Sequence, residues 1–300
     1  MKRTFRTATV TFCLIFPVLA AAAAPARGQT SHGKITVEYG SSAAFAQIAA
    51  DLKERKVSEE LQQFLAPLQL PKDLKITARD CGAQTVPYTP GGPVTICYDS
   101  IAQIVEEAKK IYPQDAFSKN LVITGATIEV VLHETAHAIF DILQVPIWGR
   151  EDDAADRLAA LLMMQFGEDM EKVTIYGTTT YFKALADSEK AWSGSDYANR
   201  AAPDAQRYFN YLCIAAAADP SIFGGALRTG TIPQFRAADC SHEYQQIVTA
   251  FYLRIMPYVD PDAMVKVRAT QWLNWSPGNA ASAGTQQNPN LGNAPTPAKR

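Results

Sequence analysis

Three residues near the middle of the chain have the types and the spacing needed to bind a metal ion and activate water. His133, Glu134 and His137 lie in a segment whose apolar residues recur at helical spacing between Thr127 and Leu143. On a helix the two histidines are one turn apart and point the same way, so both imidazoles can hold one ion. Glu134 lies about 100° further around the helix, where it can accept a proton from water at that ion. This arrangement indicates the chemistry of the HExxH helix of zinc hydrolases.

A catalytic zinc ion needs a third protein ligand and one open position. After the turn QVPIWGR, a second helix is expected to begin at Glu151 with the sequence EDDAADRLAALLMM. Acidic residues in a first helical turn also suit the helix dipole, which explains Glu151, Asp152 and Asp153 without any metal. Asp156 lies one turn further in, where aspartate is a poor helix former, and it shares a face with Asp152. We expect Asp152 to be the third ligand and Asp156 to accept the ring N–H of a ligand histidine, with Glu151 as the alternative third ligand.

The HExxH pattern is short, and chance copies occur on helices that bind no metal. Here the chain has only four histidines, and two of them belong to the pattern. The surrounding helix is strongly apolar, so burying these polar side chains costs free energy unless they have partners. These observations favour a metal site over a chance match.

The two ends of the chain are expected to lie outside the fold. Residues 1–28 combine a basic start, an apolar segment and a run of alanines, which is typical of a secretory signal peptide. Pro17 interrupts the apolar segment, which is short for a membrane span. Residues 276–300 are rich in Pro, Gly, Asn and Gln and are expected to form a disordered tail. We therefore expect an exported bacterial protein, periplasmic or secreted, without stable membrane insertion and with one two-lobed domain from 33 to 275.

The charge of the chain argues against a nucleic-acid partner. The chain has 28 Lys and Arg residues, 30 Asp and Glu residues, and a formal net charge of −2. Removal of residues 1–28 would remove four basic residues and no acidic one, leaving a net charge near −6. A nucleic-acid-binding domain normally carries a basic patch or stripe, and the sequence has none.

The cysteines predict two disulfides. One of the five cysteines, Cys13, belongs to the predicted signal peptide, and four remain in the mature chain. An even number of cysteines in an oxidising compartment indicates disulfide pairing. We predict the pairs Cys81–Cys97 and Cys213–Cys240, because each brackets one short supersecondary unit. A zinc site made of the four cysteines is disfavoured, because there is no CxxC spacing.

Strand-like segments occur only in the first half of the chain. The segment at 34–40 alternates between apolar and polar residues and ends at a glycine. The β-branched segments at 75–81 and 93–99 are separated by a Pro-Gly-Gly-Pro turn signal, and we predict that they form a β-hairpin.

Helical spacing of apolar residues is found at 41–68, at 100–112 and through most of the chain after residue 157. Because strands and helices are segregated along the chain, the sequence predicts an α+β fold. It would contain a small N-terminal β-sheet with helices, a central helix carrying the HExxH motif, and a helical C-terminal lobe.

The sequence HETAH, followed after a short loop by GREDDAAD, resembles the gluzincin-type metallopeptidases, several of which have E-x-x-A-D on the third-ligand helix. On that pattern Asp152 takes the place of the glutamate ligand, with a carboxylate one methylene shorter, and Asp156 that of the supporting aspartate. More specifically, the sequence resembles DUF4344, a group of exported bacterial metallopeptidases. Similar features extend to CG…CY at 81–98 and QRYFN…C…DP at 206–220. The resemblance covers most of residues 33–260 and implies a zincin-like fold, one Zn²⁺ ion and a peptide or protein substrate.

These observations predict an exported zinc metallopeptidase in which Glu134 is the general base. The substrate would extend along an edge strand, for which PVTIC is the candidate. Related peptidases stabilise the oxyanion with a downstream His or Tyr, and the candidates here are His242, Tyr197 and Tyr208. One alternative is a catalytically inactive pseudo-peptidase that keeps the metal as a structural clip, and another is an exported domain without metal. No sequence feature indicates the oligomeric state or the cleavage specificity.

Overall fold

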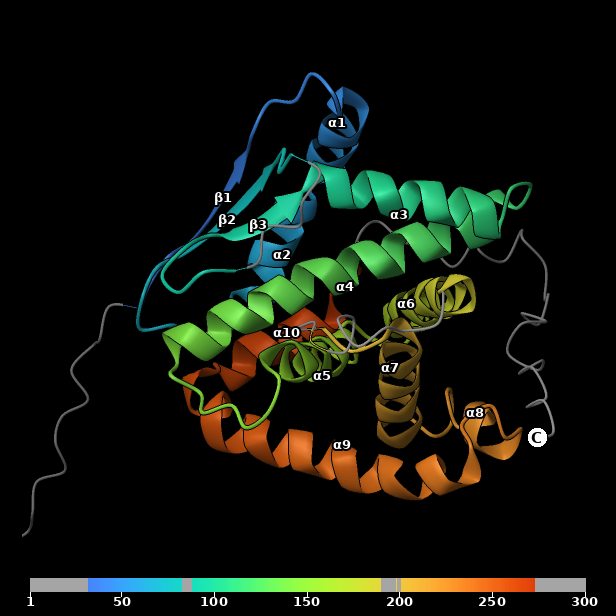
Figure 1. The fold of residues 1–300 in the computed structure, drawn as a ribbon. Helices are drawn as coiled ribbons and strands as arrows, with labels where there is room; N and C mark the ends of the chain where they lie inside the picture. The colour runs from blue at the N-terminus through green and yellow to red at the C-terminus, as the bar shows by residue number, and fades with distance from the viewer. Residues whose placement is uncertain (1–31, 83–87, 190–197, 199–200, 273–300) are drawn as a thin grey trace, which may run out of the picture. The chain divides into compact units, whose positions relative to one another are not determined.

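A computed structural model describes residues 32–82, 88–189, 198 and 201–272 of the chain (Figure 1). The predicted signal peptide and the predicted disordered tail both lie outside these residues. In the described ranges, no helix is both long enough and apolar enough to cross a lipid bilayer.

Three strands form a parallel sheet with the order β1–β2–β3, so β3 lies at an edge. Val37 of β1 pairs with Ile76 of β2, and Ile76 pairs with Val94 of β3. All four side chains of β3 are buried. Partly buried and exposed residues alternate along β1, and buried residues alternate with more exposed ones along β2. The strands are β1 (Ile35–Tyr39), β2 (Leu74–Arg79) and β3 (Val94–Cys97).

The predicted β-hairpin between residues 75–81 and 93–99 is wrong, because β2 and β3 run parallel. Parallel neighbours need a crossover connection of a dozen or more residues, and the segment at 80–93 is long enough to provide one. The Pro-Gly-Gly-Pro signal does mark a turn, in which the Gly92 N–H donates to the carbonyl oxygen of Thr89 at 2.8 Å. That turn lies within the crossover and not at the tip of a hairpin.

Both predicted disulfides are confirmed, Cys81–Cys97 and Cys213–Cys240. Cys97 is the last residue of β3, and Cys81 follows the end of β2. Because the carboxyl ends of parallel neighbours meet at one edge of a sheet, the first disulfide joins two strand ends that already lie close together. The second disulfide links helix α7 to helix α9.

The rest of the described chain is mainly helical, as expected for the second half of the sequence. The helices are α1 (Ala46–Glu54), α2 (Val57–Leu65), α3 (Tyr98–Ile111), α4 (Ala116–Ile142), α5 (Glu151–Met163), α6 (Glu168–Ser188), α7 (Asp204–Ala218), α8 (Gly225–Arg228), α9 (Gln234–Arg254), the 3-10 helix η2 (Met256–Tyr258) and α10 (Pro261–Ala269). Together with the small sheet, they form a mixed α+β arrangement.

Helix α4 is the central element. It packs against β3 and α3, and also against α5 and α6 (Figure 1). The contact with α6 is unusually close, because a Cβ atom added at Gly125 would lie 2.6 Å from the Cα atom of Gly177. The hydroxyl of Thr178 donates a hydrogen bond across this contact to the carbonyl oxygen of Gly125 at 3.0 Å. Two glycines therefore set the distance between α4 and α6.

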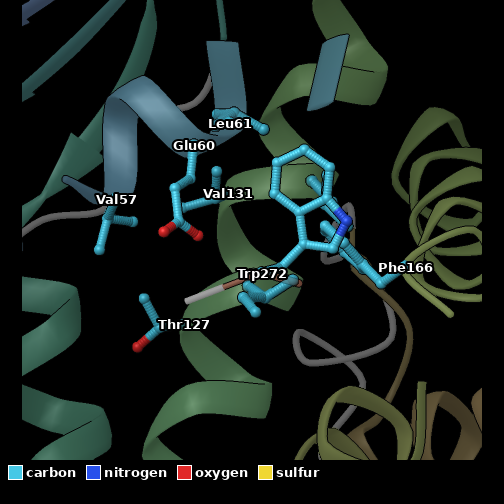
Figure 2. A pocket seen from close by; sticks show the side chains of 9 residues that line it. Val57, Glu60, Leu61, Thr127, Val131, Phe166 and Trp272 are labelled. Atoms are coloured by element: carbon cyan, nitrogen blue, oxygen red, sulfur yellow. The ribbon is translucent and has the colours of Figure 1, made fainter. Parts of the chain in front are cut away.

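One face of α4 belongs to the apolar core and not to the motif. Thr127 and Val131 on this face line a small cavity of about 30 Å³ together with α2 residues, Phe166 and Trp272 (Figure 2). The Trp272 ring makes edge contacts with Phe166 and Phe64, and its N–H donates to a backbone carbonyl of α10. Trp272 thus anchors the end of the described chain against the helix that carries the motif.

Candidate metal centre

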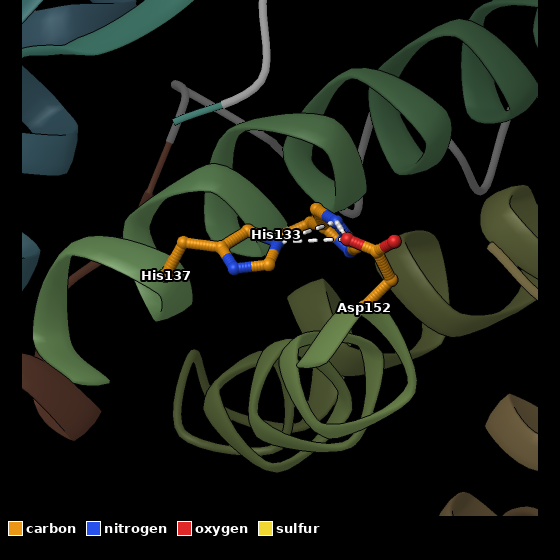
Figure 3. Close-up of side chains that lie close together, drawn as sticks. All are labelled: His133, His137 and Asp152. Atoms are coloured by element: carbon orange, nitrogen blue, oxygen red, sulfur yellow. Dashed lines mark hydrogen bonds and ion pairs between the residues drawn. The ribbon is translucent and has the colours of Figure 1, made fainter. Parts of the chain in front are cut away.

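The HExxH motif lies within the last three turns of α4, and the acidic segment forms the first turns of α5. His133 and His137 project from α4 toward α5, and the Asp152 carboxylate points between them (Figure 3). All three side chains are largely shielded, with exposed fractions of 14 %, 5 % and 13 %. The structure therefore brings together the two histidines and the acidic residue that the sequence predicts as metal ligands.

The three polar atoms that converge are all hydrogen-bond acceptors unless protonated. The Nε2 atoms of His133 and His137 are 3.2 Å apart. The Asp152 Oδ1 atom lies 3.2 Å from the His137 Nε2 atom and 3.9 Å from the His133 Nε2 atom. Ligands of a tetrahedral zinc ion at about 2.0–2.1 Å are about 3.3 Å from one another. Two nitrogens and one carboxylate oxygen at these separations fit a zinc ion both by donor type and by distance.

Each histidine has a second carboxylate on the opposite side of its ring. The His133 Nδ1 atom is 2.7 Å from the Asp156 Oδ1 atom, and the His137 Nδ1 atom is 2.7 Å from the Glu151 Oε1 atom. An ionised carboxylate only accepts hydrogen bonds, so each ring donates its Nδ1–H and keeps the Nε2 lone pair for the shared site. Carboxylates in this position fix the orientation of metal-binding histidines.

This contact changes the interpretation of Glu151. As the alternative third ligand, Glu151 would have to face the Nε2 atoms, but its carboxylate lies at the Nδ1 atom of His137. Asp152 faces the Nε2 atoms instead. Burial lowers the pKa of His137, but the hydrogen bonds with Asp152 and Glu151 outweigh this effect and raise it above the usual value. A proton therefore competes with a metal ion at this ring, and binding of a metal would release it.

The sequence interpretation missed a group of residues that contacts Asp156, the carboxylate at the Nδ1 atom of His133. Arg207 of α7 donates through Nε and Nη2 to both oxygens of Asp156, at 2.8 and 2.7 Å. Its Nη2 atom also donates to the Glu129 Oε1 atom at 2.7 Å, and the Tyr211 hydroxyl donates to the same oxygen at 2.9 Å. One sequence signal could have revealed Glu129, because it lies four residues before His133 on the same helix face.

The Glu134 carboxylate is held by the crossover between β2 and β3. Its Oε2 atom accepts a hydrogen bond from the Tyr88 N–H at 2.9 Å, and the residue is only 6 % exposed. The Tyr88 hydroxyl and the Gly91 N–H both donate to Asp141, two turns further along α4, at 2.9 and 2.8 Å. Hydrogen bonds to Glu134 and Asp141 thus hold the segment at 88–91 against α4, next to the motif.

A cavity of about 450 Å³ opens at the motif. It is lined by residues of α3, α4, α6 and α7 and reaches His133, Glu134 and Asp152. Its size is within the range of small-molecule and substrate sites. Tyr181 and Arg207 also line this cavity.

The sequence candidates for oxyanion stabilisation do not line this cavity in the described part of the chain. His242 is exposed on α9 and hydrogen-bonds with Gln246. Tyr208 lies on α7 beside Arg207 but is not among the lining residues. Tyr197 lies outside the described residues. Tyr181 of α6 does line the cavity, and no sequence signal distinguished it from its aromatic neighbours.

Comparisons with other proteins identify a family for this chain. Nothing among curated proteins or solved structures matches the chain. Residues 39–253 match the model of the DUF4344 family, which is described as "Putative metallopeptidase". This range covers more than half of the chain and contains the HExxH helix, the acidic helix α5 and Arg207. The chain therefore belongs to the DUF4344 family.

Proposed function

We propose that the protein is an exported zinc-dependent metallopeptidase with a zincin-like fold. The observation that carries this proposal is the convergence of His133 Nε2, His137 Nε2 and Asp152 Oδ1 at separations of 3.2–3.9 Å in a shielded site. Membership of a metallopeptidase family supports the reaction class. We assign His133, His137 and Asp152 as ligands of one Zn²⁺ ion, and Asp156 and Glu151 as the carboxylates that orient the histidines.

The catalytic role falls to Glu134. A zinc ion held by His133, His137 and Asp152 would supply Lewis acidity, which would make a water molecule more acidic and polarise a peptide carbonyl. Glu134 adjoins His133 on α4, and its Oε2 atom is held by the Tyr88 N–H. We assign the other carboxylate oxygen, Oε1, to take the proton from the attacking water. Glu134 then gives this proton to the leaving amine, so that it acts first as base and then as acid.

Tyr181 is our candidate for stabilising the oxyanion. Burial, followed by the nearby Glu129 charge, raises the pKa of Tyr181 to about 12, so the phenol keeps its proton at neutral pH and can donate a hydrogen bond. Replacement by phenylalanine should lower kcat by about 10²–10³-fold if this donor serves the oxyanion. An unchanged kcat in Tyr181→Phe would remove Tyr181 from the mechanism.

The substrate is proposed to be a peptide or protein that adds to β3. This strand lies at the sheet edge and packs against α4, which carries the motif. An extended chain at a sheet edge gains main-chain hydrogen bonds that do not depend on its sequence. Export is supported by the two disulfides, which are typical of proteins that fold in an oxidising compartment.

The test compares metal content and hydrolysis in matched variants of the mature protein. Wild-type protein should contain about one equivalent of zinc by mass spectrometry and should cleave peptides in a mixed peptide library. Glu134→Gln should keep the metal and lose hydrolysis, because the amide cannot accept the proton. Glu106→Gln, at an exposed glutamate of α3, is the matched control and should retain both properties. Full activity in Glu134→Gln would refute the assigned base.

A catalytically inactive metal-binding protein is the second candidate function. The observation that favours it is the burial of Glu134, because the residue is only 6 % exposed and its carboxylate already accepts a backbone hydrogen bond. This alternative predicts one equivalent of zinc but no cleavage of any library peptide by the wild-type protein. Less than about a tenth of an equivalent of zinc would exclude both functions.

A further inference from the structure

A buried ionic cluster lies directly behind the metal centre. It consists of Glu129, Asp156, Arg207 and Tyr211, which we call the Arg207 cluster. Its members come from three helices, α4, α5 and α7. Glu129 and Asp156 are 2 % and 3 % exposed and Arg207 is 16 % exposed. The cluster touches His133 through the 2.7 Å contact between His133 Nδ1 and Asp156 Oδ1.

Arg207 binds Asp156 through a bidentate, fork-like pair of hydrogen bonds. Two guanidinium nitrogens bind the two oxygens of Asp156, and the guanidinium carbon lies 4.1 Å from the centre of the Phe182 ring. A bidentate pair of this kind fixes direction as well as charge, which a lysine cannot do.

Arg207 also distinguishes between two sets of side chains that could bind a metal ion. Glu129, His133 and Asp156 form a second set of potential ligands within the described chain. The Arg207 guanidinium, however, already binds both carboxylates of that set. The positive charge of Arg207 therefore balances the negative charges of Glu129 and Asp156, as a bound metal ion would do. The Nε2 side of His133, with His137 and Asp152, is left as the site for metal.

We propose that Arg207 is a positioning residue of the metal centre. It locks Asp156, and Asp156 in turn holds the His133 ring with its Nε2 atom turned toward His137 and Asp152. The inference rests on the proposed metal site, but it does not require that the protein hydrolyse peptides. The two histidines should differ in this respect, because the carboxylate behind His137, Glu151, is 48 % exposed and can be replaced by water.

The experiment measures zinc affinity in folded variants by competition with a chromophoric chelator. Arg207→Met should bind zinc about 10–100-fold more weakly than wild type, the usual effect of losing a group that supports a metal ligand. Arg207→Lys should lose less, because it keeps the charge but not the fork. The absorption spectrum of the cobalt-substituted protein should change in Arg207→Met, because the His133 ring is no longer fixed.

Arg236 provides a matched control. It is 19 % exposed, forms a similar fork with Glu243 and contacts Asn210 of α7, but it does not line the cavity at the motif. Arg236→Met should lower thermal stability and leave zinc affinity and the cobalt spectrum unchanged. Equal zinc affinities in Arg207→Met and Arg236→Met would overturn the proposal.

A double-mutant cycle keeps the inference testable if Arg207→Met does not fold. Arg207→Lys, Asp156→Asn and the combined variant are compared for zinc affinity. If Arg207 acts through Asp156, the lysine substitution should have no further effect once Asp156 is replaced. Additive losses would refute this route. Absence of zinc from the wild-type protein would refute the proposed metal site itself, and zinc binding without hydrolysis would refute only the peptidase activity.

Discussion

The close contact between α4 and α6 predicts that Gly125→Ala destabilises the protein. A Cβ atom at Gly125 would lie 2.6 Å from the Gly177 Cα atom and 2.7 Å from the Thr178 backbone nitrogen. Apolar carbon atoms normally approach to about 3.5–4.0 Å, so the two helices would have to separate by roughly 1 Å. Separation would also weaken the hydrogen bond from the Thr178 hydroxyl to the Gly125 carbonyl.

The expected magnitude follows from three contributions. Overpacking in a close-packed interior costs about 1–3 kcal/mol, and loss of the hydrogen bond costs about 1 kcal/mol. Replacing a glycine in a helix interior by alanine gains about 1 kcal/mol from helix propensity. The net loss is about 1–3 kcal/mol, which corresponds to a fall in Tm of roughly 2–12 °C for a domain of this size.

Thermal unfolding followed by circular dichroism measures this effect. Gly225→Ala is the control, because a Cβ atom there would meet nothing closer than the Arg228 side chain at 4.0 Å, and its Tm should change little. If Gly125→Ala melts within about 1 °C of Gly225→Ala, the helices can separate at little cost, and the assigned role of the glycine contact is wrong.

Three further predictions concern charge, the crossover and the disulfide that closes it. Burial, then the neighbouring carboxylates, raise the pKa of Glu171 to about 7, so the folded state binds a proton more tightly than the unfolded state and stability falls as pH rises from about 4.5 to about 7. Glu171→Gln should therefore raise the free energy of unfolding at pH 8 by roughly 1–2 kcal/mol, after allowance for solvent screening, and should change it little at pH 4. Equal effects at both pH values would contradict the argument. Tyr88→Phe removes the hydroxyl that binds Asp141 and should lower kcat several-fold while the zinc content stays unchanged. A loss of zinc would show instead that the crossover supports the metal ligands. Replacing both Cys81 and Cys97 by alanine should cost about 3 kcal/mol in chemical denaturation, and a loss below about 1 kcal/mol would show that the crossover is ordered without its covalent link.

Local patterns predicted the parts of this fold that depend on local geometry. The apolar stripe after Thr127 indicated the motif helix, although α4 begins earlier, at Ala116. The earlier start has a local cause, because the Asp115 side chain caps the helix by accepting a hydrogen bond from the Ser118 N–H. The direction of β3 could not be predicted from its own segment, because a turn signal between two strands does not reveal whether the chain reverses or crosses over.

In the candidate metal centre too, short sequence segments predicted some residues, whereas others depend on contacts between segments far apart in the chain. Helical spacing places His133 and His137 on one face, and it also places Asp152 and Asp156 on one face, so the ligand set could be proposed from short segments. Arg207 is 51 residues away from Asp156 in the chain, and nothing in its own segment indicates which carboxylates it binds. Such a contact depends on how α5 and α7 pack, which no local pattern specifies.

The packing of α5 bears on how the short side chain of Asp152 reaches the Nε2 atoms of both histidines. Asp152 and Asp156 face the histidines of α4, and Ala155 and Ala159 lie on the same face of α5 at helical spacing. Both alanines are completely buried, as is Ala136 of α4, the residue before His137. Small side chains between two helices allow their backbones to approach more closely than leucine or valine would permit. The Asp152 carboxylate lies 3.2 Å from the His137 Nε2 atom and 3.9 Å from the His133 Nε2 atom. We expect substitution of these alanines by larger residues to push α5 away from α4 and to withdraw the carboxylate from the site.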